Sequence, residues 1–292
     1  MNSAIVSGAT GFIGIHLVHE LVSAGVDVVV LCQYKCANLT RIPGSVRVVY
    51  ELSELPYADV FYHLAWEQAS GPGRLDAVLQ SKNVTLTLEV LHAANKIGAK
   101  FIALGTVYER FADKVSHADK FDNSNFYILA KHSAHNMSNQ LAYKLGNDYV
   151  WCQICHPIGR YIKHEQLMAY VISSLIDGTP PSFGPAETLY DVVAVEDVAQ
   201  GLCLLGKQKT PRREYYIGSG NPKPLREILQ QTKAILRTDT PLMIGTRPDD
   251  GLLFEESWFD ISLISHDVGY EPCIGFEQSV CAVADWITKG LG

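Results

Sequence analysis

A tyrosine and a lysine lie four residues apart at Tyr127 and Lys131, within a helical pattern over residues 126–145 that puts both on one face. A phenol can exchange a proton with a substrate oxygen once its pKa falls from about 10 toward neutral pH. A neighbouring ammonium group favours the phenolate and so lowers that pKa. A core tyrosine beside a surface lysine gives the same spacing. The spacing by itself therefore does not predict proton transfer; it does so only together with further site residues.

Three glycines, Gly8, Gly11 and Gly14, follow Ser7 directly after the first apolar run. Glycines in a strand-to-helix turn let the backbone approach a pyrophosphate, which then meets the free N–H groups at the helix N-terminus. A tight turn that binds nothing can have the same pattern. The position between a strand at 4–6 and a helix at 12–24 favours a dinucleotide loop.

Short apolar runs alternate with helical patterns up to about residue 157, which is typical of βαβ units around a parallel sheet. We expect strands at 4–6, 26–31, 46–49, 60–64, 101–104 and 149–154, and helices at 12–24, 80–96 and 126–145. A dense group of glycines and prolines at 178–185 then breaks this rhythm. Beyond it we expect strands at 192–193 and 215–217, helices at 195–205 and 224–236, and an apolar pattern at 280–287.

These elements predict an α/β fold, a Rossmann-like doubly wound parallel sheet with a smaller C-terminal substrate-binding lobe. Residues 1–158 form the expected dinucleotide-binding domain, to which residues 188–206 return. Residues 159–187 and 207–292 form the expected substrate lobe.

The composition restricts the partners. The 292 residues are 47% hydrophobic and 19% charged, with a net charge of −7, which disfavours a nucleic-acid or anionic membrane surface. No apolar stretch approaches the roughly 20 residues of a membrane span, and the N-terminal residues lead into a strand rather than a signal peptide. The seven cysteines are irregularly spaced. Cys152 and Cys155 have redox-like spacing but lie in or beside an apolar run, so buried thiols in a reducing cytoplasm fit better.

The segment Gly8 to Gly14, Gly-Ala-Thr-Gly-Phe-Ile-Gly, resembles the signature of extended short-chain dehydrogenases/reductases, the NAD(P)-dependent nucleotide-sugar epimerases, dehydratases and reductases. Further similar segments follow in the family's order and cover nearly the whole chain. They are Asp59–Trp66, Asn83–Val84, Gly105–Thr106, Tyr127–Lys131, Asp191–Ala199, Tyr215–Gly220 and Val268–Pro272.

The resemblance implies a catalytic Thr106, Tyr127 and Lys131, in which Tyr127 exchanges the proton and Lys131 also holds the nicotinamide ribose. An alignment on Val107 and Tyr108 would instead place Leu104, which has no hydroxyl, in the threonine position. The implied cofactor-binding residues are Gly8, Thr10, Gly11, Phe12, Ile13, Gly14, Cys32, Lys35, Leu64, Ala65, Trp66, Asn83, Tyr127, Lys131 and Ile158.

The residue after the second strand bears on the cofactor. An acidic residue there would bind the NAD ribose and repel a 2′-phosphate, whereas this chain has Cys32, with Lys35 and Arg41 nearby. We therefore favour NADP(H) and keep NAD(H) as the alternative. Family dehydratases have Asp and Glu directly after the catalytic threonine; Val107 and Tyr108 cannot act as that acid and base.

These features favour an NADPH-dependent reductase of a nucleotide-diphosphate 4-keto-6-deoxysugar. The alternatives are an NAD-retaining nucleotide-sugar 4-epimerase and, from a different class, a non-catalytic dinucleotide sensor. Expected substrate contacts are Thr106, Tyr127, His156 and Arg247, although His156 fits a structural role equally well. We expect no metal, and a homodimer that pairs helices 80–96 and 126–145.

Overall fold

The computed structural model describes residues 1–34, 36–117, 125–249 and 251–289. The chain forms two compact units, each assembled from segments that are distant in the sequence. Unit 1 contains residues 1–154, 199–217 and 262–270, and unit 2 contains residues 155–198, 218–261 and the chain from 271 onward.

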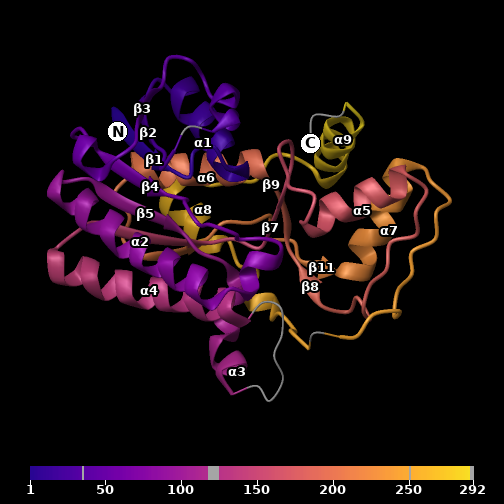
Figure 1. Ribbon diagram of the computed structural model, residues 1–292. Coiled ribbons are helices and arrows are strands. Elements are labelled where there is room, and N and C mark those ends of the chain that lie inside the picture. Colours follow the sequence, from indigo (N-terminus) through magenta and orange to yellow (C-terminus); the bar gives the residue numbers. More distant parts are fainter. Residues whose placement is uncertain (35, 118–124, 250, 290–292) are drawn as a thin grey trace. The chain divides into compact units, whose positions relative to one another are not determined.

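A seven-stranded parallel sheet forms the centre of unit 1, in the order β10-β6-β5-β4-β1-β2-β3 (Figure 1). Its strands are β1 (Ser3–Ser7), β2 (Asp27–Leu31), β3 (Arg47–Val49), β4 (Val60–His63), β5 (Lys100–Leu104), β6 (Tyr149–Gln153) and β10 (Glu214–Tyr216). The chain builds β1 to β3 outward in one direction and β4 to β10 in the other. The strand order therefore reverses between β1 and β4, the position at which α/β sheets bind ligands.

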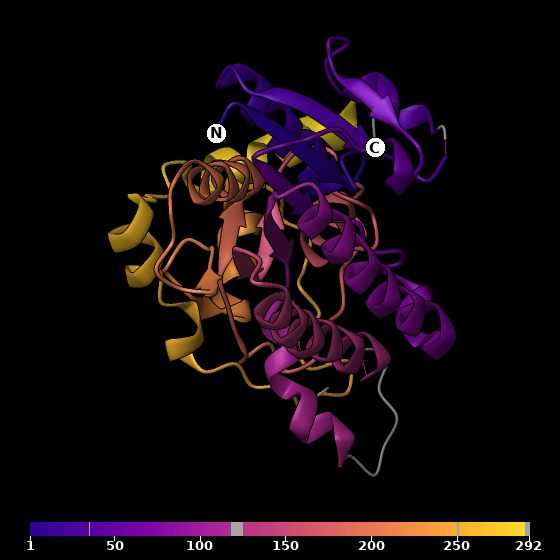
Figure 2. The ribbon, with the colours of Figure 1, turned by 90° about the vertical axis from the view of Figure 1, so that its left-hand side faces the viewer.

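Two long helices, α2 (Ala77–Lys96) and α4 (Asn125–Leu145), pack side by side against one face of the sheet (Figure 2). Phe61, Phe101 and Trp151 from the sheet join Leu91 of α2 and Ala134 of α4 in one apolar cluster. Parallel strands are covered on both faces, so their sequences are nearly continuously apolar. The remaining helical elements of unit 1 are α1 (Phe12–Ser23), α3 (Ala112–Ser116), α8 (Ser262–Val268), η1 (Ala37–Arg41), η2 (Leu52–Glu54), η3 (Pro72–Leu75) and η4 (Val107–Phe111).

The described residues of unit 2 form three helices, two short strand pairs and a short 3₁₀ helix. Its elements are β7 (His156–Ile158), α5 (Leu167–Ile176), β8 (Leu189–Tyr190), β9 (Val192–Ala194), β11 (Lys223–Pro224), α7 (Leu225–Leu236), η5 (Glu256–Phe259) and α9 (Phe276–Thr288). Strand β7 pairs in parallel with β9, and β8 pairs antiparallel with β11. Residues of α5 and α7 share an apolar cluster around Val171 and Leu229. Helix α5 was not expected, because the glycine and proline group after it suggested irregular structure throughout.

The sheet and its helices confirm the expected fold class, whereas the unit boundaries differ from those expected. Residues 207–217 and 262–270 belong to unit 1, because β10 extends the central sheet beside β6 and α8 packs on β10. Residues 188–198 belong to unit 2, because β9 pairs with β7. The helix α6 (Val195–Lys207) begins in unit 2 and continues into unit 1. No helix in the described ranges is long and apolar enough to cross a membrane.

Candidate active site

The glycine loop closes tightly between β1 and α1. The amide of Gly11 donates to the carbonyl of Gly8, and α1 begins at Phe12 without a side-chain cap on its first amides. Gly8 has a φ of +73°, and a Cβ added there would lie 2.5 Å from the amide nitrogen of Ala65. A Cβ on Gly14 would lie 2.1 Å from the carbonyl oxygen of Gly8. The loop therefore requires glycine at both positions and leaves helix N–H groups for an anionic ligand, so it fits a dinucleotide.

Other predicted cofactor residues surround this loop. Asn38 of η1 donates to the carbonyl of Thr10, which ties the glycine loop to the chain after β2. Cys32 is buried at the end of β2, and burial raises the pKa of its thiol, with Cys36 adding to the shift. The end of this strand is thus uncharged, as the sequence predicts. Phe12 is buried and Ile13 is half-buried, and Lys35 lies outside the described residues.

The segment after β4 carries Leu64, Ala65 and Trp66, which the sequence assigns to the cofactor. The amide of Leu64 donates to Ser7, which joins this segment to the glycine loop. Asn83 of α2 is buried and forms two hydrogen bonds with the backbone of Glu67. In this structure Asn83 therefore positions the loop between β4 and α2, which in turn presents Trp66.

Thr106 lies two residues beyond the end of β5 and caps η4. Its hydroxyl accepts from the amide of Tyr108, and Thr106 also acts to lower the pKa of Tyr127. The alternative residue, Leu104, contributes only its backbone carbonyl, which accepts a 2.8 Å hydrogen bond from Lys131 Nζ. This effect on the phenol supports Thr106 as the partner of Tyr127.

Tyr127 and Lys131 lie one turn apart on the buried face of α4. Burial raises the pKa of Tyr127, against the lowering effects of Arg74 and the Thr106 hydrogen bond. This net direction is opposite to the one expected from the lysine alone, because removing the phenolate from water outweighs the nearby cation. Burial also lowers the pKa of Lys131 to about 7, although Glu109 acts to raise it. The phenol is therefore protonated at neutral pH, the form that an acid needs.

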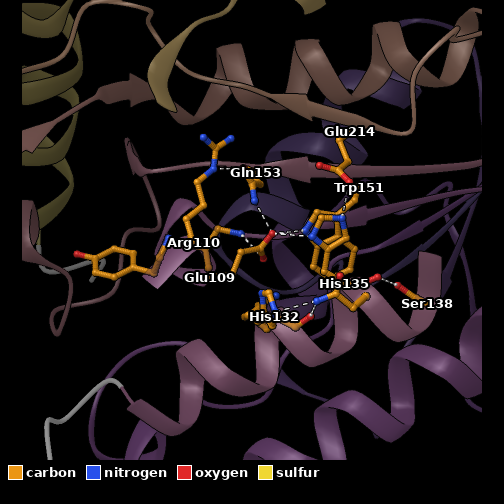
Figure 3. A network of polar contacts seen from close by, with 12 residues as sticks. Glu109, Arg110, His132, His135, Ser138, Trp151, Gln153 and Glu214 are labelled. Carbon is orange, nitrogen blue, oxygen red and sulfur yellow. Dashed lines mark hydrogen bonds and ion pairs between the residues drawn. The ribbon is translucent and has the colours of Figure 1, made fainter. Parts of the chain in front are cut away.

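Behind these residues, Glu109 anchors a buried polar network (Figure 3). Its side chain is only 2% exposed and accepts hydrogen bonds from Trp151 Nε1 and Gln153 Nε2. His135 Nδ1 lies 3.0 Å from the same carboxylate, and its Nε2 lies 3.2 Å from Glu214. The imidazole also stacks on Trp151, with ring centroids 4.8 Å apart.

The two carboxylates control the charge of His135. Burial acts to lower its pKa, but the hydrogen bonds and charges of Glu109 and Glu214 outweigh burial and raise the pKa to about 9. The imidazolium therefore compensates a carboxylate that would otherwise be costly to bury. His135 follows Lys131 by one helical turn, so α4 supplies the proton-transfer pair and this supporting cation from a single face.

The other predicted residues belong to unit 2. His156 forms an edge contact with Tyr190 at 4.2 Å and donates its backbone amide to Asp191, and Ile158 is fully buried in β7. Arg247 donates to Ser182 at 2.7 Å and to the Tyr170 hydroxyl at 3.3 Å. All seven cysteines are free, and Cys152 and Cys155 are buried, which confirms the expectation of buried thiols.

Three contributors to the site were missed from the sequence: Arg74, Glu109 and His135. Glu109 carried one usable signal, since its spacing of three from Thr106 matches a capping box. Arg74 lies in a loop without periodicity, and His135 gains meaning only from partners more than twenty residues away.

Comparison with known proteins agrees with this architecture. The family model "NAD dependent epimerase/dehydratase family" matches residues 4–218. A dTDP-glucose 4,6-dehydratase from Xanthomonas campestris is 22% identical over 98% of this chain and 93% of its own length. UDP-glucuronic acid decarboxylase 2 from Arabidopsis thaliana is 29% identical over 94% of this chain and 66% of its own length.

Solved structures share the fold. UDP-glucose 4-epimerase from Thermotoga maritima, solved with UDP-glucose, superposes with a TM-score of 0.80 at 19% identity, over 99% of this chain and 100% of that one. UDP-N-acetylglucosamine 4-epimerase from Methanobrevibacter ruminantium gives a TM-score of 0.82 at 16% identity, with 99% of each chain covered. The family match covers the glycine loop, Thr106, Tyr127 and Lys131 together. The chain therefore belongs to the NAD-dependent epimerase/dehydratase family and is an enzyme of the extended short-chain dehydrogenase/reductase type.

Proposed function

We propose that this enzyme reduces the C4 ketone of a nucleotide-diphosphate 4-keto-6-deoxysugar with NADPH. The observation that carries the proposal is the placement of a buried Tyr127 and Lys131 one turn apart on α4, with Thr106 among the groups that act on the phenol. Val107 and Tyr108 occupy the places where family dehydratases have their acid and base.

In the proposed reaction, Thr106 orients the ketone oxygen and Tyr127 donates its proton to that oxygen as the carbinol forms. The nicotinamide cofactor, when bound, would supply the hydride for C4. Lys131 would hold the ribose of the cofactor, and its protonated form would stabilise the phenolate that remains on Tyr127. Solvent then returns a proton to Tyr127 before the next turnover.

Dehydration of the sugar fits this site less well. Val107 is fully buried and Tyr108 has no carboxylate, so neither can remove a proton from carbon and protonate a leaving hydroxyl. Glu109 is the nearest carboxylate in sequence, but Trp151, Gln153 and His135 surround it. A carboxylate with these partners serves as a structural anion.

The cofactor preference rests on the end of β2. The neutral thiol of Cys32 does not repel a 2′-phosphate, which supports NADP(H). Cys32 also lacks the carboxylate with which an acidic side chain would bind the ribose hydroxyls of NAD. Gly8, Thr10, Gly11, Phe12, Ile13 and Gly14 form the proposed pyrophosphate loop, with Leu64, Ala65, Trp66, Asn83 and Ile158 as further cofactor residues and Lys35 as a phosphate partner.

A nucleotide-sugar 4-epimerase that retains NAD is the second candidate. It is supported by the matching fold of the two 4-epimerases and by solved relatives of this fold that contain NAD. The same Thr106, Tyr127 and Lys131 would serve a transient oxidation at C4. A non-catalytic dinucleotide sensor is the remote third candidate, because it would not need the set of Thr106, Tyr127 and Lys131.

The experiment that separates these candidates is to denature the purified protein and quantify the released dinucleotide. Bound NADP or an empty site supports the reductase, and a panel of nucleotide-linked 4-keto sugars is then assayed with NADPH and NADH. Near-stoichiometric NAD, with interconversion of C4 epimers, would replace the reductase by the epimerase. Binding without turnover of any sugar in the panel would favour the sensor.

We also propose that His156 and Arg247 contact the nucleotide sugar.

We further propose that the chain forms a cytoplasmic homodimer through α2 and α4. On these helices Val78 is 66% exposed and Tyr143 is 77% exposed, and large apolar groups in water favour association. Light scattering of the protein and of a Val78→Glu, Tyr143→Glu variant tests the dimer. A monomeric mass for the unmodified protein would contradict it.

A further inference from the structure

Arg74 lies directly over the ring of Tyr127. Its guanidinium carbon is 4.2 Å from the centroid of that ring and 5.5 Å from the centroid of the Tyr108 ring. Arg74 belongs to η3, so it approaches α4 from the loop that joins β4 to α2. The proton-transfer residue is therefore covered by a guanidinium from outside its own helix, while Lys131 lies one turn along α4.

The loop that carries Arg74 is held by buried amide side chains. Gln80 is 1% exposed, accepts from Trp66 Nε1 and donates to the carbonyls of Gln68 and Gly73. Asn83 adds its two hydrogen bonds to the backbone of Glu67. These hydrogen bonds fix the loop and so hold Arg74 in one position. A guanidinium at a solvated surface would not require such support.

The guanidinium also carries unused donors. Within the described part of the chain, Arg74 Nε and Nη2 are buried and have no hydrogen-bond partner. Buried polar groups in native proteins nearly always have partners, and a guanidinium matches oxygen acceptors in a planar fork. Donors left open beside Tyr127 point to an oxygen-bearing ligand at this position.

We propose that Arg74 is a positioning residue for Tyr127, which stabilises the phenolate formed by proton transfer and offers Nε and Nη2 to oxygen atoms of the bound sugar. A cation over an aromatic face is attracted to the ring, and the attraction grows when the ring becomes a phenolate. The groups that act on this phenol are Arg74, Glu109 and Thr106; Tyr108 shares the Arg74 guanidinium, and Lys131 lies one turn along α4. Arg74 and the Thr106 hydrogen bond favour the phenolate, whereas burial and Glu109 oppose it.

The sugar contact rests on the proposed function, but the effect on the phenolate does not. Removing the guanidinium charge raises the pKa of Tyr127 whether the reaction runs as a reduction or as a transient oxidation. The pH midpoint that reports Tyr127 then moves upward in both cases. This makes the inference testable on the protein without any substrate.

The test is an ultraviolet titration of tyrosinate in the full-length protein and in Arg74→Met, each corrected by its own Tyr127→Phe counterpart so that Tyr127 is seen alone. We expect the midpoint to rise by about one pH unit in Arg74→Met. Arg74→Lys keeps a positive charge and should restore most of that shift. An unchanged midpoint in Arg74→Met would overturn the proposal.

Steady-state kinetics with whichever nucleotide-linked 4-keto sugar of the panel is turned over test the second half of the proposal. Both Arg74 variants should raise KM for the sugar about tenfold, because a lysine lacks the planar fork, and leave KM for the dinucleotide unchanged. Arg226→Met is the matched control, since that guanidinium binds Glu187 and Pro185 on unit 2. Equal sugar KM values in Arg74→Met and the control would refute the sugar contact. A melting temperature for each variant identifies any that fails to fold, and Arg74→Gln then replaces Arg74→Met.

Discussion

The ammonium nitrogen of Lys131 lies 3.7 Å from the centre of the Trp66 ring while it donates to the carbonyl of Leu104. The same indole meets the Tyr127 ring edge-on, with centroids 6.2 Å apart. Trp66 therefore contacts both proton-transfer residues. The loop after β4 thus contributes an aromatic side chain to the site, and the end of β5 contributes the carbonyl of Leu104.

Trp66 should hold Lys131 through a cation–π contact. Replacing Trp66 with Leu removes the aromatic face, so we expect about a fivefold loss in dinucleotide affinity, which corresponds to about 1 kcal/mol. Trp66→Phe retains an aromatic face and should lose less. Fluorescence titration with NADPH and NADH measures both variants, and equal affinities for Leu and Phe would contradict this role.

Tyr127 should be required for turnover but not for cofactor binding. Tyr127→Phe keeps the ring between Arg74 and Trp66 and removes the proton, so we expect kcat to fall by roughly 10²–10⁴-fold. Dinucleotide affinity, measured by the same titration, should stay within about twofold. A variant with full activity would exclude the proposed acid.

His135 should make stability depend on pH. Its pKa is about 9 in the folded protein against 6.5 for an unperturbed histidine, so the folded state binds the proton more tightly. The resulting stabilisation is fully present below pH 6.5 and is lost as pH rises toward 9, and it amounts to about 3 kcal/mol at most. Lys131 affects stability in the opposite direction. Its pKa is lowered to about 7 in the folded protein, so its contribution to the free energy of unfolding rises between pH 7 and 10.5.

The difference between the original protein and His135→Gln therefore isolates the histidine, since Lys131 is common to both. Urea unfolding at pH 6, 7.5 and 9 should show the largest loss of stability in the variant at pH 6 and the smallest at pH 9. A loss that stays constant across this range would mean that His135 is not charged in the fold.

Gly8 should be irreplaceable in the dinucleotide loop. Its φ of +73° costs an alanine about 1–2 kcal/mol, and the added Cβ would overlap the backbone at Ala65. Gly8→Ala should lower the melting temperature and abolish dinucleotide binding. Gly44→Ala is the matched control, because a Cβ there meets nothing within 4 Å. A Gly8→Ala protein that binds the dinucleotide normally would contradict the role of the loop.

Local patterns in the sequence determined much of unit 1. Continuous apolar runs predicted its strands β1 to β6, and helical spacing predicted α1, α2 and α4, because a buried parallel sheet imposes those patterns on the chain. The glycine loop and the spacing of Tyr127 and Lys131 were also readable, since both depend on neighbours within one turn or one helix.

The tertiary structure alone decided the relationships that connect distant segments. Nothing in the sequence near Arg74 indicates that it covers Tyr127, more than fifty residues later, or that His135 links Glu109 to Glu214. The assignment of β9 to one unit and β10 to the other likewise follows from which strand each one pairs with. The periodicity of apolar residues indicates which face of a helix or strand is buried. It does not indicate which side chains of other elements contact that face. Burial and unlike neighbours then set the pKa values of Tyr127, Lys131 and His135, so the chemistry of this site is a property of the folded chain.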